Sequence, residues 1–221
     1  MTHWVNTPHA PVEVLHADEA LLVVHKPAGL LSVPGRGPDK QDCLITRLQQ
    51  QFADALVVHR LDMATSGLMV FARTLAVQRA LGEAFAQRQV HKRYEAVVQG
   101  LVHLAPLVWH DITLPIYADW AQRPLRMVHE ALGQASHTRW QLVSQNAAAG
   151  TSKVALEPLT GRTHQLRVHM QAVGHPIVGD ALYAPADVAA ATPRLLLHAS
   201  SLAFTHPSTL QTINFQCPTP F

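Results

Sequence analysis

Short apolar runs, separated by glycine, proline and other turn residues, set the hydrophobic pattern of this chain. Runs of this kind that are rich in Leu and Val predict buried β-strands. They lie at residues 21–24, 55–58, 68–71, 91–98, 137–143, 153–156, 195–204 and 210–217. The run at 91–98 alternates apolar and polar positions, which is typical of a strand with one buried face. The pattern therefore predicts a sheet built from segments spread along the whole chain.

Three other segments carry apolar residues at helical spacing. The first is 41–52, the second follows Thr74, whose hydroxyl can cap it, and the third is 164–173. Residues 101–135 show neither period and are the least regular part of the chain. Many strands and few helices predict an α+β fold, in which a mixed, largely antiparallel central sheet is flanked by helices and loops.

One domain is expected after a short N-terminal arm. The 221 residues are 48% hydrophobic, which is enough for a well-buried core, and no linker or low-complexity stretch divides them. Residues 1–20 contain Pro8 and Pro11 and little periodicity, so an extended arm that ends in a short strand is predicted there. Residues 21–221 then form the single domain.

Composition restricts the location and the partners of the protein. Lys and Arg number 17 against 15 Asp and Glu, so any nucleic-acid site must be a local basic patch, to which the 15 histidines can add charge as pH falls. The N-terminus lacks the features of a signal peptide, and no apolar stretch is long enough to span a bilayer. A cytoplasmic protein without membrane contact is expected. Without a heptad pattern, a monomer is expected.

No pattern for a cofactor or a metal ion is present. The sequence has no P-loop and no GxGxxG, and the spacing of His164 and His169 does not form an HExxH motif. Cys43 and Cys217 lie far apart and belong to no CxxC pattern, so both are predicted to be reduced, mostly buried thiols. The chemistry of this chain is therefore expected to depend on its side chains alone.

The most distinctive polar stretch is HRLDMATSG, from His59 to Gly67. It lies between two of the apolar runs, so its turn lifts Arg60 and Asp62 to a surface or cleft. An Asp beside a turn is most often a cap or a turn former, and composition alone does not distinguish that role from a catalytic one.

Two further motifs make the chain resemble the RluA family of RNA pseudouridine synthases. They are KPAGLLSVPGR (Lys26 to Arg36) and GRTHQLRVHM (Gly161 to Met170), and the resemblance runs from about Leu21 to the C-terminus. It implies the pseudouridine synthase fold, with an active-site cleft across the sheet. Some members carry an additional S4-type RNA-binding domain at the N-terminus, for which this chain has no room.

The resemblance implies that Asp62 is the catalytic carboxylate. Isomerising uridine to pseudouridine breaks the N1 glycosidic bond and rejoins the base through C5, without redox change or group donor, so no cofactor is expected. A carboxylate can serve as nucleophile or base beside an electron-deficient ribose carbon. A buried Asp62 needs a nearby cation, which the resemblance assigns to Arg167. It also places Tyr94 in the active site, against the uracil.

The expected partners are tRNA and 23S rRNA, since the motifs most resemble those members that modify both a tRNA anticodon stem-loop and a 23S rRNA hairpin. Arg60 is expected to fill the space of the flipped base, a role that suits a planar guanidinium. The other candidate RNA contacts are Lys26, Arg36, Lys92, Arg93 and Arg162, although solvated surface charge is the commoner fate of each.

Three alternatives stay open at the level of sequence. Residues 101–135, with Arg123 and Arg126, form either an RNA-contacting insertion or an ordinary loop. The enzyme could modify a different rRNA or tRNA uridine. The chain could also be a non-catalytic RNA-binding module, although binding alone requires no buried acid.

Overall fold

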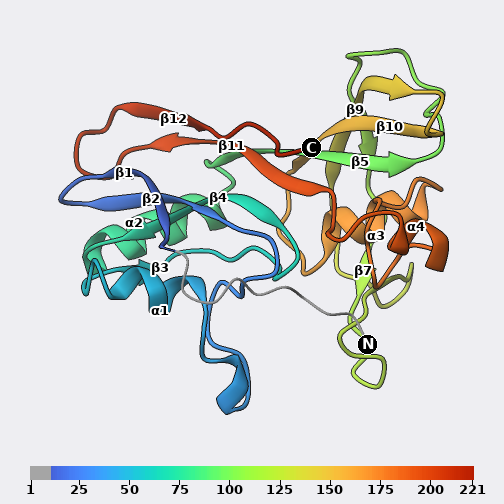
Figure 1. The fold of residues 1–221 in the computed structure, drawn as a ribbon. Coiled ribbons are helices and arrows are strands. Elements are labelled where there is room, and N and C mark those ends of the chain that lie inside the picture. The colour runs from blue at the N-terminus through green and yellow to red at the C-terminus, as the bar shows by residue number, and fades with distance from the viewer. Residues whose placement is uncertain (1–10) are drawn as a thin grey trace. The chain divides into compact units, whose positions relative to one another are not determined.

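The computed structural model describes residues 11–221, so residues 1–10 of the predicted arm lie outside the described part. The chain divides into two compact units, which are drawn in Figure 1. The first unit extends to Lys92 and includes Ala199–Pro220, and the second contains Arg93–His198 and Phe221.

Two strands carry the chain between the units. Strand β5 (His91–Gln99) begins in the first unit and continues in the second, and β11 (Leu197–Thr205) leads back into the first. Most of β5 thus belongs to the second unit and most of β11 to the first.

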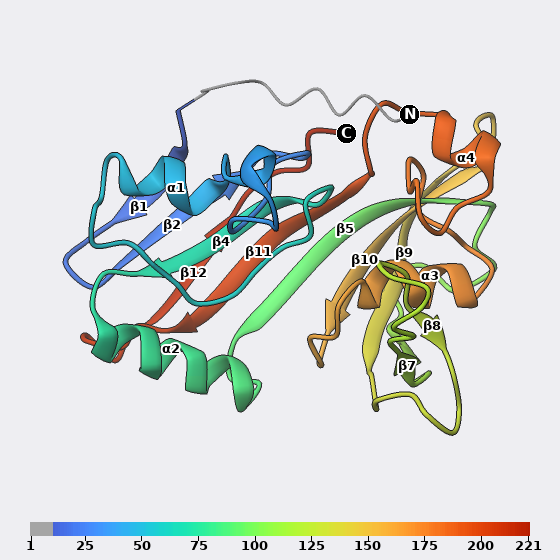
Figure 2. The same ribbon diagram turned by 90° about the horizontal axis from the view of Figure 1, so that it is seen from below.

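The first unit is a largely antiparallel sheet with helices. Its elements are β1 (Glu13–Ala17), β2 (Leu21–Lys26), a 3-10 turn η1 (Pro38–Lys40), α1 (Leu44–Gln49), β3 (Leu56–Val57), β4 (Ser66–Ala72), α2 (Leu75–Ala86) and β12 (Thr212–Gln216). The strand order is β1-β2-β4-β11, with β12 beside β11 and β3 beside β4. Helix α2 packs against β3 and β4 (Figure 2).

Strand β4 is the centre of this unit, because every one of its residues is buried. On one face Leu68 and Val70 pack into a cluster with Val77 and Leu81 of α2. Thr74 starts that helix by accepting a hydrogen bond from the Val77 N–H at 3.2 Å, as the sequence predicts. The strand that follows HRLDMA is thus covered on both sides and gives the preceding loop a rigid support.

The second unit contains strands in the order β5-β10-β9-β6, each antiparallel to its neighbours. Its further elements are β6 (His110–Ile112), β7 (Ile116–Tyr117), β8 (Met127–Val128), β9 (Thr138–Asn146), β10 (Thr151–Pro158), α3 (Gln165–Ala172) and α4 (Ala186–Ala190). Strands β7 and β8 pair with each other in a small separate sheet. Helix α3 contacts β8, β9 and β10, so it joins the large sheet of this unit to the small one.

The α+β fold with a mainly antiparallel sheet is confirmed, and each predicted strand and helix has a counterpart in the structure. The run at 55–58 yields only the two residues of β3, and the helix predicted over 41–52 shortens to α1. Strands β6, β7 and β8 in the irregular stretch were not predicted, because two or three residues are too few to show a period. Among residues 11–221, no helix is long and apolar enough to cross a membrane.

Gly67 lets β4 and β11 lie against each other. Its φ angle is +117°, a value that residues with a side chain rarely adopt, and a Cβ atom there would collide with the backbone N and O of Ala199. The glycine of the Thr-Ser-Gly turn is therefore required both by its backbone conformation and by the neighbouring strand.

We expect Gly67→Ala to lower the free energy of unfolding by about 3 kcal/mol, since the strain and the collision add together. Denaturant unfolding would measure the change. Gly82→Ala is the matched control: Gly82 lies within α2, and a Cβ there meets no atom within 4 Å. That substitution should stabilise the protein by about 0.5–1 kcal/mol. Equal effects of the two alanines would contradict this account of Gly67.

Candidate active site

Asp62 lies in the loop between β3 and β4 of the first unit. Its side chain is half-buried, whereas the neighbouring Leu61 and Ala64 are buried. The Thr65 N–H donates to the Asp62 carbonyl at 3.1 Å and closes a tight turn directly before β4. The carboxylate is thus presented from a short turn that a fully buried strand continues.

Lys26 holds the far side of this loop from the end of β2. Its ammonium donates to the carbonyls of Pro27 at 2.8 Å, Leu30 at 2.7 Å and Met63 at 3.1 Å, and its side chain is fully buried. A buried ammonium requires such acceptors, because it loses its hydration. Lys26 was predicted to contact RNA, but its ammonium has an internal role instead: it joins the KPAGL turn to the residue after Asp62.

Ser32 holds the near side of the same loop. Its hydroxyl donates to the Leu61 carbonyl at 2.7 Å and accepts from the Leu61 N–H at 3.2 Å, and only 3% of the residue is exposed. The backbone is therefore fixed by buried polar groups on both sides of Asp62. Sequence reasoning missed Ser32; its one signal is a lone hydroxyl among apolar residues in LLSVPG.

His59 forms the base of the loop and is neutral. Its Nε2 atom accepts a hydrogen bond from the Val70 N–H at 3.1 Å, and its ring stacks on Phe85 with centroids 4.6 Å apart. Burial, helped by the charge of Lys92, lowers the pKa of His59 to about 3. A neutral imidazole is what the Val70 N–H requires, because a protonated one cannot accept its hydrogen bond.

The other basic residues predicted in the first unit differ in exposure. Arg60 and Arg36 are exposed, each in a loop, and are open to a ligand. Lys92 is half-buried, with its ammonium 5.8 Å from the centroid of the Phe85 ring, and burial lowers its pKa. Lys92 thus packs with the base of the Asp62 loop and offers less of its charge to RNA than the two arginines do.

Arg167 lies on α3 of the second unit, where it forms a buried ion pair. Its Nε donates to Asp180 Oδ2 at 2.8 Å and its NH2 group to Asp180 Oδ1 at 2.6 Å. Neither side chain is more than 5% exposed. A guanidinium has five N–H groups, so this two-point pairing fixes its plane while using two of them. The sequence analysis did not foresee this pair.

Tyr183 links the Arg167 side chain to the loop between β7 and β8, which is far from it in sequence. The guanidinium carbon of Arg167 is 5.0 Å from the centroid of the Tyr183 ring, and the Tyr183 hydroxyl is 2.6 Å from His164 Nδ1. The same hydroxyl accepts from the Arg126 N–H at 2.9 Å. The start of α3 and the segment between β7 and β8 are therefore held by one phenol.

Two of the remaining predicted residues of the second unit lie next to each other on β5. Tyr94 is half-buried on β5, opposite Leu156 of β10. Arg93, next to it, donates to Glu157 at 2.7 Å and stacks on Trp109, while half of its side chain stays exposed.

Arg162 and Arg167, the two arginines of GRTHQLR, differ in environment. Arg162 is exposed and bonds the Ala135 carbonyl at 3.3 Å, whereas Arg167 is buried. Each predicted residue is thus placed within its own unit: Asp62 and its braces in the first, Tyr94 and Arg167 in the second.

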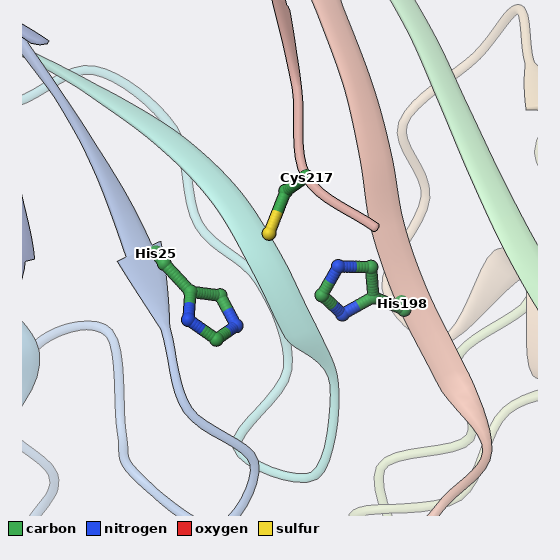
Figure 3. A group of neighbouring side chains, drawn as sticks. All are labelled: His25, His198 and Cys217. Carbon is green, nitrogen blue, oxygen red and sulfur yellow. The ribbon is translucent and has the colours of Figure 1, made fainter. Parts of the chain in front are cut away.

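One group of side chains in the described residues has the composition of a metal site. His25, His198 and Cys217 each offer a ligand atom, and these atoms lie within 4.8 Å of one another (Figure 3). Two imidazoles and a thiolate are a donor set that Zn²⁺ accepts. Burial and the charge of Glu13 raise the pKa of the Cys217 thiol, however, and so favour the protonated form, which is not a ligand.

Comparison with known proteins gives consistent matches over nearly the whole chain. Residues 20–172 match the family described as RNA pseudouridylate synthase. The dual-specificity RNA pseudouridine synthase RluA of Escherichia coli K12 is 45% identical, over 98% of this chain and 97% of its own. The enzyme of the same name from Yersinia pestis is 46% identical over 94% and 99%.

Solved structures of similar proteins give the same result. Human RNA pseudouridylate synthase domain containing 1 superposes with a TM-score of 0.78 at 29% identity, covering 95% of this chain and 84% of that one. Human RNA pseudouridylate synthase domain containing 4 gives a TM-score of 0.72 at 26% identity, covering 94% and 88%.

The loop contacts predict that Ser32→Ala lowers the free energy of unfolding by about 2 kcal/mol, because the buried N–H and carbonyl of Leu61 lose their partner. Hydrogen exchange should show faster exchange of the amides of residues 61–65. Ser136→Ala is the matched control, since Ser136 is equally buried and donates only to the Gln134 carbonyl at 2.9 Å, in the other unit. Unchanged exchange at 61–65 in Ser32→Ala would refute the bracing role.

The neutral state of His59 predicts a specific loss of stability in acid. Its pKa of about 3 in the folded protein lies below the ordinary 6.5, so below pH 6.5 the unfolded chain takes up a proton that the folded chain does not. This favours unfolding by about 2 kcal/mol at pH 5 relative to pH 7. Between pH 7 and pH 5, the free energy of unfolding of the wild type should therefore fall by about 2 kcal/mol more than that of His59→Gln. His103→Gln, at an exposed position, is the control. Identical curves of unfolding free energy against pH for wild type and His59→Gln would contradict the prediction.

Proposed function

The chain belongs to the RNA pseudouridylate synthase family and isomerises uridine to pseudouridine in RNA, and we propose that it does so in both tRNA and 23S rRNA. The observation that carries the choice of targets is the similarity, along nearly the full length of both chains, to relatives named dual-specificity enzymes. The expected sites are an anticodon stem-loop and an rRNA hairpin. We propose the cytoplasm as its location and residues 21–221 as one catalytic domain.

Asp62 is the proposed catalytic carboxylate. In the reaction the bond between ribose C1′ and uracil N1 breaks, the uracil turns, and a bond from C1′ to C5 forms. The C5 proton then leaves and N1 takes up a proton, so the product is an isomer of the substrate. The carboxylate starts this sequence either by adding to C1′ or by taking a proton from C2′. The uracil is both the leaving group and the returning nucleophile, so the second carboxylate that a glycosidase uses to activate water is not required.

The bracing of the Asp62 loop supports this role. A reacting group gains rate when it is held in position before the substrate arrives, and the hydrogen bonds of Lys26 and Ser32 fix the backbone on either side of Asp62. An Asp that served only as a turn former would need no such arrangement.

Arg167 and Tyr94 are the other proposed catalytic residues. Arg167 contributes a positively charged guanidinium whose plane is fixed by Asp180. The Asp62 carboxylate must stay ionised away from water, and it therefore needs such a charge. Tyr94 contributes an aromatic face for the uracil and a phenol that can help to move the C5 proton.

RNA binding is proposed to use the exposed arginines. Arg60 lies two residues before Asp62 and is proposed to occupy the place of the flipped base, where its planar guanidinium can stack and donate. Arg36, Arg93 and Arg162 are the proposed contacts to phosphate.

We predict that Asp62→Asn lowers the rate of tritium release from RNA labelled at uridine C5 by at least about 1,000-fold, because the amide is neither a nucleophile nor a base. Binding of the same RNA should persist, since the amide keeps the shape of the side chain. Asp187→Asn, an exposed substitution on α4, is the matched control and should leave release unchanged.

The same assay with two different RNAs tests which RNAs the enzyme modifies. Wild-type release from both an anticodon stem-loop and the 23S rRNA hairpin supports dual specificity. Release from one alone restricts the enzyme to that RNA, and release by Asp62→Asn at the wild-type rate removes Asp62 from the mechanism.

A further inference from the structure

The loop between β7 and β8 exposes an indole ring. Trp120 keeps 70% of its surface exposed, and only Leu210, at 76%, is more exposed among the large apolar residues of the described chain. A single exposed apolar residue is common on protein surfaces, so exposure alone indicates no function. What distinguishes Trp120 is the set of groups around it.

A guanidinium lies on the face of this ring. Arg123, itself exposed, is placed over the Trp120 indole, so a flat aromatic surface and a flat cation form one platform. Asp119 is the one acid between β7 and β8, and its oxygens accept from the Ala121 N–H at 2.9 Å and the Gln122 amide at 3.1 Å. The carboxylate is thus used to shape the loop.

The base of the loop is fixed to the element that carries Arg167. The Arg126 N–H donates to the Tyr183 hydroxyl, and Leu125 packs with Val168 and Tyr183. The Arg126 side chain folds back on the loop, donating to the Leu125 carbonyl at 2.8 Å. The platform is therefore attached through Tyr183 to α3 and does not hang from a free hairpin.

We propose that Trp120 and Arg123 form a binding subsite for one unpaired nucleotide of the substrate RNA, with the base stacked on the platform and its phosphate near the guanidinium. The inference rests on the proposed function, which supplies RNA as the substrate. Aromatic and guanidinium planes are the groups on which proteins stack splayed bases. Every base has a π-face, so such a subsite tolerates different sequences, as an enzyme with two RNA targets requires.

The test is RNA affinity, measured by fluorescence anisotropy with labelled anticodon stem-loop and 23S rRNA hairpin, in the Asp62→Asn background so that no turnover occurs. Trp120→Ala should weaken binding of at least one RNA about 10-fold, and Trp120→Phe should stay within about 3-fold of the parent. Leu107→Ala is the matched control, because Leu107 lies in the same unit and is 68% exposed. It should leave affinity unchanged.

A second measurement reports on stacking itself. RNA should quench the tryptophan fluorescence of the parent protein, and Trp120→Phe should lose most of that quenching although it still binds. The inference is overturned if Trp120→Ala binds both RNAs like the parent, or if Leu107→Ala weakens binding to the same extent.

The outcomes separate this inference from the proposed function. A wild-type protein that binds RNA but releases no tritium refutes the catalytic proposal and leaves the Trp120 test intact. Normal release together with unchanged affinity in Trp120→Ala refutes the subsite alone. Failure of the parent protein to bind either RNA overturns both.

Discussion

The position of Asp62 depends on a lysine ammonium that is enclosed by backbone carbonyls. Lys26 has no exposed surface, and its ammonium donates to two carbonyls of its own turn and to that of Met63, the residue after Asp62. An ammonium removed from water is costly unless its donors are used, so the turn and the loop must keep their relative position for as long as Lys26 stays buried. The hydroxyl of Ser32 fixes the preceding residue in the same way, and β4 supplies a rigid continuation.

The second unit positions its cation by a different means. Arg167 is held by a carboxylate, and Asp180 also accepts from the N–H groups of Leu182 and Tyr183. A buried ion pair gains little net stability, because desolvation offsets most of its attraction. What the two-point geometry provides is a fixed orientation of the guanidinium plane. Each unit therefore holds its proposed catalytic group by polar contacts from buried side chains, and these contacts fix orientation more than they add stability.

The sequence was most informative where local chemistry decides the structure. The capping hydroxyl of Thr74 correctly predicted where α2 begins. The Val-rich runs correctly predicted β3 and β4, the strands on either side of the HRLDMATSG loop. It was least informative for Lys26, since lysines are usually exposed and nothing in KPAGL shows which carbonyls will surround the ammonium. Ser32 and Asp180 belong to the same class, because their partners lie 29 and 13 residues away and meet them only in the folded chain. Resemblance identified Arg167 by its motif, yet it gave no information about the acid that orients it.

The enclosure of Lys26 has a chemical consequence. Acylating reagents and acetyltransferases must reach the amine that they modify, and the Lys26 amine is out of their reach while three backbone carbonyls surround it. Modification of this residue must wait for the loop to open, whereas the exposed Lys40 reacts directly. The labelling rate of Lys26 relative to Lys40 therefore reports how often the Asp62 loop opens. Mass spectrometry can measure this ratio on the wild-type protein.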